Sequence, residues 1–335
     1  MSRTFIPEGY SSLLTLYETQ EAIEQIKKTF QSNLCKSLNL HRVSAPLFVD
    51  GNSGLNDDLS GVERPVSFDM LETGDEAQVV HSLAKWKRLA LMRYGFPEGT
   101  GLYTDMNAIR RDETLDNLHS VYVDQWDWEK VIPEEQRTLD TLKDAMLRIV
   151  SAICVTADML SWQYPMLKNT LDRNVTFVTT QELEDLYPDL NGKERENAFL
   201  KEHHTVGLLQ IGKVLRSGKV HDTRAPDYDD WEMNGDILFW NDVLGCALEI
   251  SSMGIRVSPE SLDRQLTLSG KQERRHLPFH QALLRGELPF TIGGGIGQSR
   301  LCMLLLHKAH IGEVQSSCWD PDTRRICAEK NVTLL

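Results

Sequence analysis

The sequence predicts an α+β fold with a mainly antiparallel central sheet that is flanked by helices. Strand-like and helix-like segments follow one another in mixed order, without the regular alternation of a doubly wound fold. The strand-like segments 236–241 and 246–257 are separated by a short turn, which favours an antiparallel hairpin. No internal repeat, low-complexity tract or flexible linker divides the 335 residues, so we expect one domain over residues 1–335.

Periodicity and breaker residues place the other elements. Apolar residues at helical spacing predict helices over residues 19–35, 78–94 and 135–163, a charged helix over 181–205, and a last helix after the glycines at 293–297. Gly95 ends the second helix. A short apolar strand broken by Pro46 precedes a loop rich in Gly, Asn, Asp and Ser over residues 50–64, and residues 119–131 are strand-like.

Composition excludes several classes of protein. The formal net charge of -13 disfavours general nucleic-acid binding, because an acidic surface repels phosphates. No apolar run approaches the roughly 20 residues that span a bilayer, and residues 1–12 lack a signal-peptide pattern, so we expect a cytoplasmic protein without a membrane segment. The six cysteines form no CxxC pair and are expected to be free thiols.

The segment GGGIGQSR is the first candidate for chemistry. Gly293, Gly295 and Gly297 alternate, so on a strand they leave one face bare, and a flat ligand can lie against the backbone there. Arg300 follows in the first turn of the next helix, where a guanidinium can stack on a purine or hold a phosphate. The alternative is a glycine-rich turn with a surface arginine.

The strand LEISSMGIRV carries the second candidate. Strict alternation places Glu249 and Ser251 on one face, and Ser252 and Arg256 on the other, unless a bulge at Gly254 brings the two sets together. A carboxylate beside hydroxyls, with Asp236 of the neighbouring strand, supplies the hard oxygen ligands that magnesium prefers. An exposed strand face with ordinary polar residues is the alternative.

Three further segments carry polar residues that could bind an amino acid. Gln125 and Asp127 share one strand face and would suit an amino group, or else belong to a partly exposed strand. Lys87 lies on the apolar stripe of helix 78–94, where it either snorkels to the surface or points into a polar cleft. The loop HDTRAPDYDDW is either an active-site lid or a solvated acidic loop, and His221 within it has no nucleophilic partner nearby.

These segments together resemble class II aminoacyl-tRNA synthetases. The apolar segment around Pro46 resembles their first motif, Arg110 in NAIRRDE their second, and Gly293 to Arg300 their third. The blocks VVHSLAKWKR, GLYTDMNAIR, LHSVYVDQWDWE and RAPDYDDW are similar to the ammonia-dependent aspartate–ammonia ligase family, also called asparagine synthetase A. Such blocks extend from about residue 40 to 306. The family usually has a proline where this chain has Arg111, and we assign the phosphate contact to Arg110.

The resemblance implies a reaction of L-aspartate, ATP and ammonia that yields L-asparagine, AMP and pyrophosphate through β-aspartyl adenylate. It also implies magnesium as the cofactor and a homodimer in which helix 19–35 contributes to the interface. An N-terminal cysteine nucleophile and a glutaminase domain are missing from the sequence, which favours free ammonia as the nitrogen donor.

Roles for individual residues follow from the same resemblance. Arg110 and Arg300 clamp the triphosphate, with the glycines at 293, 295 and 297 beneath ATP. Magnesium is held by Asp236, Glu249 and Ser252. The aspartate ammonium is held by Asp57, Gln125 and Asp127, and its α-carboxylate by Lys87 and Arg256. The remaining pocket residues are Ser82, Ser120, Arg224, Asp229 and Ser251.

Two other functions remain open at this point. An aspartyl- or asparaginyl-tRNA synthetase would need an anticodon-binding module, which no segment of the sequence provides, and the net charge argues against tRNA. A non-catalytic paralogue that binds an amino acid would be expected to have lost Arg110, Glu249 or Arg300, and all three are present.

Overall fold

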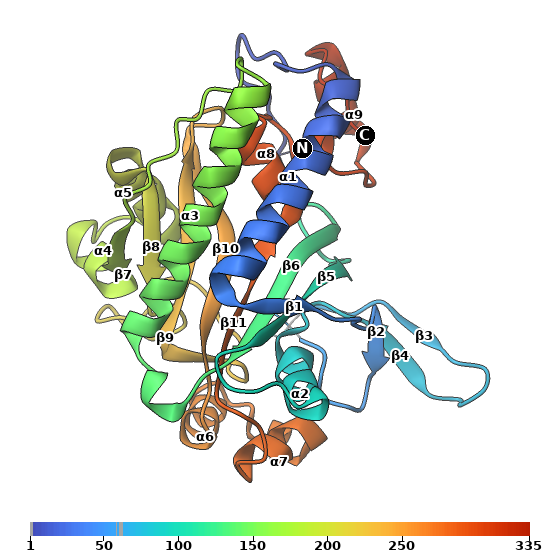
Figure 1. Cartoon of the computed structure of the whole chain (residues 1–335), viewed down its shortest axis with the longest axis vertical. Coiled ribbons are helices and arrows are strands. Elements are labelled where there is room, and N and C mark those ends of the chain that lie inside the picture. Colours follow the sequence, from blue (N-terminus) through green and yellow to red (C-terminus); the bar gives the residue numbers. More distant parts are fainter. Residues whose placement is uncertain (1–2, 58, 60–62) are drawn as a thin grey trace.

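The computed structural model describes residues 3–57, 59 and 63–335. Its larger sheet contains the strands in the order β1-β5-β6-β11-β10-β9-β8-β7 (Figure 1). Their bounds are β1 (Leu40–Arg42), β5 (Gly101–Ile109), β6 (Tyr122–Val131), β11 (Thr291–Gly297), β10 (Cys246–Arg256), β9 (Asp229–Asn241), β8 (Thr205–Leu209) and β7 (Thr176–Thr179). The predicted hairpin of 236–241 and 246–257 is confirmed as β9 and β10, which pair antiparallel.

This sheet is mixed, which corrects the expectation of a mainly antiparallel sheet. Neighbours from β5 to β8 pair antiparallel, but β1 pairs with β5, and β7 with β8, in parallel. Parallel neighbours need a long crossover connection. The first passes through α2 (Ala84–Tyr94), and the second through α4 (Thr180–Leu186) and α5 (Gly192–His203). Residue periodicity does not show the direction in which an edge strand joins a sheet.

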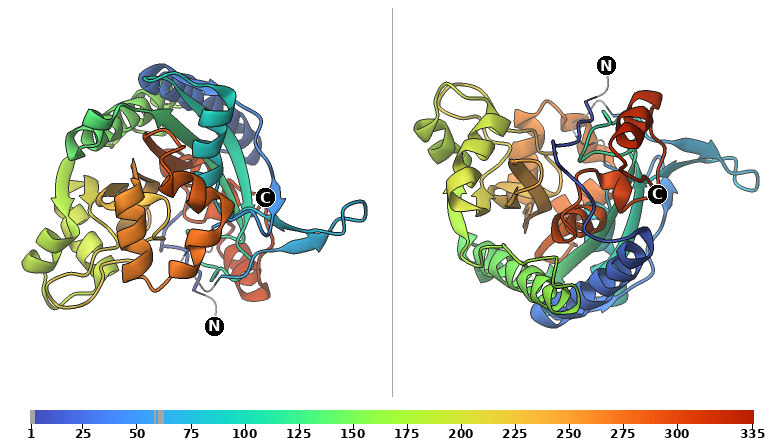
Figure 2. Two further views of the ribbon diagram at one scale, coloured as in Figure 1. Left: turned by 90° about the horizontal axis from the view of Figure 1, so that it is seen from below. Right: turned by 90° about the horizontal axis from the view of Figure 1, so that it is seen from above.

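A separate three-stranded sheet projects from the body as an arm (Figures 1 and 2). It contains β2 (Phe48–Asp50), β4 (Glu76–Val79) and β3 (Ser67–Asp69), in that order. The predicted helix 78–94 begins only at Ala84, because residues 76–79 pair with both β2 and β3. The predicted loop 50–64 follows β2, and its residues 58 and 60–62 lie outside the described part of the chain.

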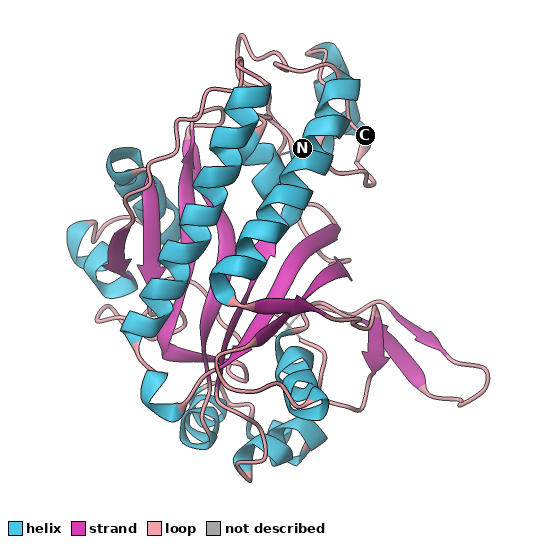
Figure 3. Cartoon of the chain, viewed as in Figure 1, coloured by secondary structure: helices cyan, strands magenta, loops and turns pink. Residues whose placement is uncertain are grey.

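Two long helices, α1 (Leu16–Leu38) and α3 (Leu139–Gln163), lie side by side across one face of the larger sheet (Figures 2 and 3). Thr15 begins α1 with a capping box to Glu18. On the sheet side, Phe30 is fully buried, with its ring centroid 4.8 Å from that of Trp126 in β6. Both helices confirm the predictions over 19–35 and 135–163.

By length and composition alone, α3 is the one helix among the described residues that could cross a membrane. More than half of its apolar stretch is buried inside the protein, where it packs on α1 and β9. This burial is typical of the core helix of a globular domain.

The remaining helices are α6 (Pro259–Leu268), α7 (Pro278–Leu284), α8 (Gln298–Leu305) and α9 (Pro321–Glu329), with short 3-10 turns at Glu134–Gln136, Gln272–His276 and Ile311–Glu313. The helix after the glycines is confirmed as α8. The predicted helix 181–205 is instead the pair α4 and α5. The chain breaks between them because Pro188 cannot continue a helix and Asn191 caps the next one.

Candidate active site

A cavity of about 480 Å³ lies against the larger sheet, and most of the predicted site residues line it. Gln125 and Asp127 of β6 point into the cavity, while Trp126 between them packs beneath α1. Because strand side chains alternate, the cavity lies on the face away from α1 and α3. The predicted residues that line it are Asp57, Ser82, Lys87, Arg110, Ser120, Gln125, Asp127, Arg224, Asp229, Asp236, Glu249, Ser252, Arg256, Gly295, Gly297 and Arg300.

Ser251 does not line the cavity, which corrects its prediction as a pocket residue. The pairing of β10 with β9 shifts register between Glu249 and Ser251, so strict alternation fails there. Glu249 and Ser252 therefore both reach the cavity, and the buried Ser251 donates its hydroxyl to the carbonyl of Gly295 at 3.0 Å. The register shift that brings Glu249 and Ser252 to the same side lies between Glu249 and Ser251, and a second shift between Gly254 and Arg256 confirms the irregularity that the sequence suggested at Gly254.

Gly293 does not line the cavity either. A Cβ at this position would lie only 1.9 Å from Oε2 of Glu129 and 2.7 Å from the guanidinium of Arg256. The missing side chain therefore makes room for a buried ion pair rather than for a flat ligand. The prediction that all three alternate glycines lie beneath ATP is wrong for Gly293.

Gly295 makes room for the two residues predicted to bind an amino group. A Cβ there would lie 2.6 Å from Oδ1 of Asp127 and 2.6 Å from Oε1 of Gln125. Both polar groups thus occupy the space that a side chain on β11 would take. The strand face of β11 is bare at Gly295, but the neighbouring strand β6 covers it with Gln125 and Asp127, the residues expected to bind the substrate.

Lys87 points into this constellation and not outward to solvent. Its side chain is 1% exposed, and its Nζ lies 2.9 Å from the carbonyl oxygen of Gly294 and 3.4 Å from Oδ2 of Asp127. Burial lowers the pKa of the Lys87 ammonium, although Asp127 partly offsets the effect. A deeply placed cation beside a carboxylate can orient a zwitterionic substrate.

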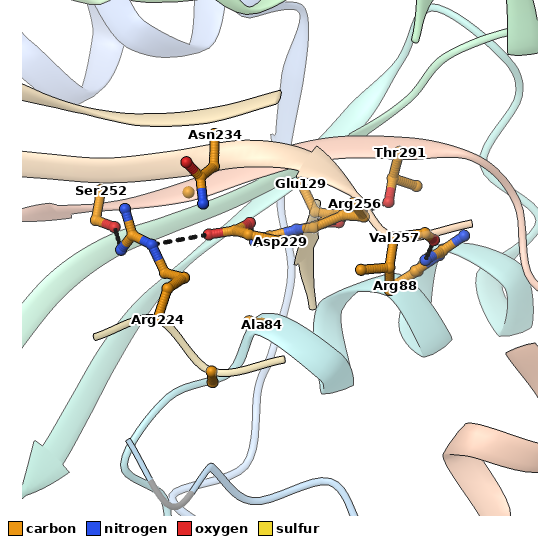
Figure 4. Close-up of polar contacts among 12 residues, drawn as sticks. Ala84, Arg88, Glu129, Arg224, Asp229, Asn234, Ser252, Arg256, Val257 and Thr291 are labelled. Atoms are coloured by element: carbon orange, nitrogen blue, oxygen red, sulfur yellow. Dashed lines mark hydrogen bonds and ion pairs between the residues drawn. The ribbon is translucent and has the colours of Figure 1, made fainter. Parts of the chain in front are cut away.

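Arg256 is the centre of a buried ionic chain on the cavity wall (Figure 4). Its Nη2 lies 2.7 Å from Oε2 of Glu129, and its Nη1 donates to Asp229. Thr291 donates its hydroxyl to Glu129 at 2.7 Å. Burial alone would lower the pKa of Arg256, but the two carboxylates outweigh it and the net pKa is raised. Several of its N–H donors are therefore already engaged within the protein.

Asp236, Glu249 and Ser252 come together as predicted, and Arg224 lies among them. The Nη2 of Arg224 lies 2.6 Å from Oδ1 of Asp236. Its Nη1 donates to the hydroxyl of Ser252, a contact that Figure 4 shows. Burial, with Glu249 nearby, raises the pKa of Asp236 to about 6, although Arg224 counteracts this. Two carboxylates that repel each other beside a hydroxyl are a donor set suited to a divalent cation.

The fit to magnesium is partial, since no group of three or more His, Cys, Asp or Glu side chains has a metal-binding arrangement in the described part of the chain. Two carboxylates and one hydroxyl would leave several coordination positions to water and phosphate oxygens. Magnesium usually binds proteins in this way when it accompanies a nucleotide. The three residues therefore fit a nucleotide-bound magnesium ion and not a dedicated protein cage.

The far part of the cavity carries cations that suit a polyphosphate. Arg300 donates to the carbonyl of Glu249 at 3.1 Å, and its side chain is 24% exposed. Arg110 follows β5, and its Nε has no hydrogen-bond partner among the described residues. Arg110 lines the cavity, whereas Arg111 does not, which agrees with the choice of Arg110.

Several charged residues in or beside the cavity were missed by sequence reasoning, and Glu129 and Lys193 are two of them. Glu129 continues the face of Gln125 and Asp127, so period-two alternation could have found it. Lys193 on α5 lines the cavity mouth, with its Nζ 3.0 Å from Oε2 of Glu196 and 3.9 Å from Asp222. No local pattern marks Lys193, because α5 ends more than 40 residues before β10 begins in the chain.

The family and the fold of the chain are shown by comparison with known proteins. The model of the aspartate-ammonia ligase family matches residues 17–331. A curated aspartate–ammonia ligase of Clostridium perfringens is 59% identical over 336 residues, which cover 100% of both chains. One of Bacillus cereus is 57% identical over 325 residues, covering 97% of this chain and 99% of that protein.

Solved structures share the fold at low sequence identity. The asparaginyl-tRNA synthetase of Entamoeba histolytica in complex with asparaginyl-adenylate matches with a TM-score of 0.64 at 13% identity, covering 90% of this chain and 66% of that one. The asparaginyl-tRNA synthetase of Pyrococcus horikoshii, also complexed with asparaginyl-adenylate, gives 0.64 at 15% identity, covering 89% and 68%. These likenesses show a class II synthetase-like fold. Because the family model covers most of its length and the bacterial ligases match it closely from end to end, the chain belongs to the aspartate–ammonia ligase family.

Proposed function

We propose that this aspartate–ammonia ligase makes L-asparagine in the cavity through a β-aspartyl-adenylate intermediate. The observation that carries the proposal is the layout of the cavity. On one face of the sheet it places residues that can bind an amino acid next to residues that can bind a polyphosphate and its metal ion. Gln125, Asp127 and Lys87 form the amino-acid group, and Glu249 and Arg300 belong to the polyphosphate group.

The chemistry consists of two acyl-transfer steps that balance. An oxygen of the aspartate β-carboxylate attacks the α-phosphorus of ATP, and the bond from the α-phosphorus to the α,β-bridging oxygen breaks to release pyrophosphate. Ammonia then attacks the acyl carbon, loses one proton, and AMP departs. Adenylation is needed because a free carboxylate is a poor acyl donor, and the protein contributes mainly by orientation and electrostatic stabilisation.

The substrate zwitterion is held by the inner part of the cavity. Asp57, Gln125 and Asp127 accept hydrogen bonds from the ammonium group, and Lys87 orients the α-carboxylate. Arg256 contributes mainly through its field, since Glu129 and Asp229 engage several of its N–H donors. The other pocket residues, which border the substrate, are Ser82, Ser120, Arg224 and Asp229. This arrangement leaves the β-carboxylate facing the nucleotide.

The nucleotide is held by the outer part of the cavity. Arg110 and Arg300 bind phosphate oxygens, with Gly297 beneath the nucleotide, whereas Gly295 lies beneath the substrate-binding Gln125 and Asp127. Asp236, Glu249 and Ser252 would hold magnesium, which when bound neutralises phosphate charge. Arg110 is suited to this role because its Nε is free of hydrogen-bond partners within the described residues.

Isotope exchange tests the intermediate and the role of Arg110. With L-aspartate and without ammonia, the enzyme should exchange labelled pyrophosphate into ATP, since adenylation is reversible. Arg110→Ala should lower that exchange by about 10²-fold, the loss typical of one transition-state charge contact. An Arg110→Ala enzyme with unimpaired exchange would show that the assignment is wrong.

We also propose that the chain acts as one catalytic unit, as a cytoplasmic homodimer. The expected interface on helix 19–35 needs revision, because its apolar stripe (Ala22, Ile26, Phe30 and Leu34) is fully buried within the chain. A dimer would have to use other surfaces, such as the exposed Leu16 and Tyr17 at the start of α1. Light scattering during size exclusion tests this, and a clean monomer would contradict it.

A further inference from the structure

The side chain of Arg224 is bound to two of the three residues that could coordinate magnesium, Asp236 and Ser252. Its guanidinium reaches Asp236 through Nη2 at 2.6 Å and Ser252 through Nη1. Its Nε lies 3.8 Å from Oδ2 of Asp229, which is too long for a hydrogen bond. The side chain is 11% exposed, so this cation is nearly withdrawn from solvent. The guanidinium thus stands where a divalent cation would bind.

The two cations cannot share these ligands. A divalent ion on Asp236 and Ser252 would lie beside the guanidinium at a distance where like charges repel strongly in a poorly solvated site. Binding of the metal–nucleotide complex therefore requires Arg224 to leave Asp236. Other negative charges nearby are the carboxylate of Asp229 and the substrate itself.

The segment around Arg224 is anchored on both sides, so the side chain is the part that can move. On one side, His221 lies 3.0 Å from Oε1 of Glu196 and is buried. On the other, the fully buried Asp227 lies 2.9 to 3.3 Å from Arg274, His280 and Lys85. A pivot of the arginine side chain between Asp236 and Asp229 needs no rearrangement of these anchors.

Asp229 alone is a weak alternative partner for Arg224. Its Oδ1 already accepts from Arg256, which is itself paired with Glu129. A third anion near Asp229 would complete the new position of the guanidinium. The α-carboxylate of L-aspartate is such an anion, and in the proposed function it lies beside Lys87 and Arg256 on the same wall.

We propose that Arg224 is a shared positioning residue that couples the two subsites: the substrate carboxylate draws its guanidinium from Asp236 and thereby opens the magnesium–nucleotide subsite. Aspartate and the metal–nucleotide complex then bind with positive cooperativity. Because coupling is reciprocal, each ligand tightens the other by the same factor. This inference rests on the proposed function, in which both subsites belong to one cavity.

The test measures binding without turnover. The probe is Mn²⁺ with α,β-methylene-ATP, which cannot be cleaved at the reacting bond, and Mn²⁺ is followed by electron paramagnetic resonance. In the wild-type enzyme, saturating L-aspartate should tighten this complex by about 10-fold, within the range of ordinary allosteric coupling. The reverse titration, followed by calorimetry, should give the same factor for aspartate.

Arg224→Gln provides the decisive comparison. Without aspartate it should bind the Mn²⁺ complex about 10-fold more tightly than wild type, and aspartate should no longer change that affinity. Unchanged or weaker affinity without aspartate would overturn the proposal, because Arg224 would then be a simple substrate or phosphate ligand. A wild-type coupling factor of one would also overturn it, and this needs no variant to fold.

Two further variants separate the possible failures. Arg216→Gln removes an exposed arginine upstream on the same segment, paired with Asp185, and should behave as wild type. Asp236→Asn should weaken binding of the Mn²⁺ complex. If Asp236→Asn binds the Mn²⁺ complex as tightly as wild type, the proposed metal ligands are wrong. If Asp236→Asn does weaken binding but L-aspartate leaves the affinity of the wild-type enzyme unchanged, only the proposed role of Arg224 is refuted.

Discussion

Replacement of Gly295 by alanine should damage aspartate use far more than ATP use. The new Cβ would lie 2.6 Å from Oδ1 of Asp127 and from Oε1 of Gln125, whereas real contacts of this kind are not shorter than 3.0 Å. Each oxygen must therefore retreat by at least about 0.4 Å, and by about 0.8 Å to reach ordinary van der Waals contact. Neither oxygen can remain where we place the substrate ammonium.

The magnitude follows from the sensitivity of catalysis to position. A misplacement of about 1 Å can cost about 10²-fold in rate, so a shift of about 0.4 to 0.8 Å corresponds to roughly a 5- to 40-fold loss. We expect kcat/KM for L-aspartate to fall by this factor, while KM for ATP stays within about twofold.

Steady-state kinetics of purified Gly295→Ala, with each substrate varied in turn, measure the effect. Gly51→Ala is the matched control, because its Cβ would meet the flexible end of Gln78 at 3.0 Å and the carbonyl oxygen of Glu76 at an ordinary 3.5 Å, on the projecting arm. Wild-type kcat/KM for aspartate in Gly295→Ala, together with an intact fold by circular dichroism, would refute the placement of the ammonium between Gln125 and Asp127.

Three other changes probe the cavity wall, the metal ligands and the buried lysine. Glu129→Gln should lower the free energy of unfolding by about 3 to 5 kcal/mol in urea titrations, because it leaves Arg256 buried without its main partner. The affinity for Mn²⁺ should fall about 10-fold per pH unit below pH 6, since protons compete for Asp236, whose pKa is raised to about 6. Lys87→Met should raise KM for aspartate at least about 10-fold, because the Asp127 carboxylate loses its buried cation.

Each of these expectations has its own control. Glu287→Gln removes an exposed pair with Arg285 and should change stability by less than about 1 kcal/mol. Equal losses in the two glutamate variants would contradict the account of the buried pair. In Asp236→Asn the drop in Mn²⁺ affinity near pH 6 should disappear, and its persistence would assign the titration to another group.

The Glu129–Arg256 pair should also stabilise the protein in a pH-dependent way. Burial alone would raise the pKa of Glu129, but Arg256 outweighs burial and the net pKa is lowered. A carboxylate whose pKa is lowered by folding stabilises the native state above its unfolded pKa, and that contribution is lost as the pH falls through the folded value. This loss in acid should be absent from Glu129→Gln.

Much of the site could be predicted because its residues lie on strands with regular alternation. Gln125 and Asp127 were placed on one face of β6, and the structure has both in the cavity. The alternating glycines of β11 predict a strand face without side chains of its own for a flat ligand, and at Gly293 that face instead holds Glu129 and Arg256. What fills that face could not be read from β11, because Glu129 and Asp127 come from the neighbouring strand, and strand pairing is not visible in a local pattern.

The errors arise where one strand depends on another. Ser251 was placed beside Glu249 by alternation, and a bulge that forms only against β9 turned it away. The predicted helix 78–94 includes residues 78 and 79, but their pairing with β2, and that of residue 78 with β3, places them in a strand. The contact of Arg224 with Asp236 joins a loop to a strand and carries no sequence signature.

Transfer of an oxygen isotope tests the central claim that the side-chain carboxylate is adenylated in this cavity. The enzyme would be incubated with ATP, ammonia and L-aspartate labelled with ¹⁸O in the β-carboxylate, and the AMP analysed by mass spectrometry. We predict one ¹⁸O atom in each AMP formed, and none when the α-carboxylate carries the label. Label in pyrophosphate or inorganic phosphate, or unlabelled AMP from β-labelled aspartate, would contradict the account.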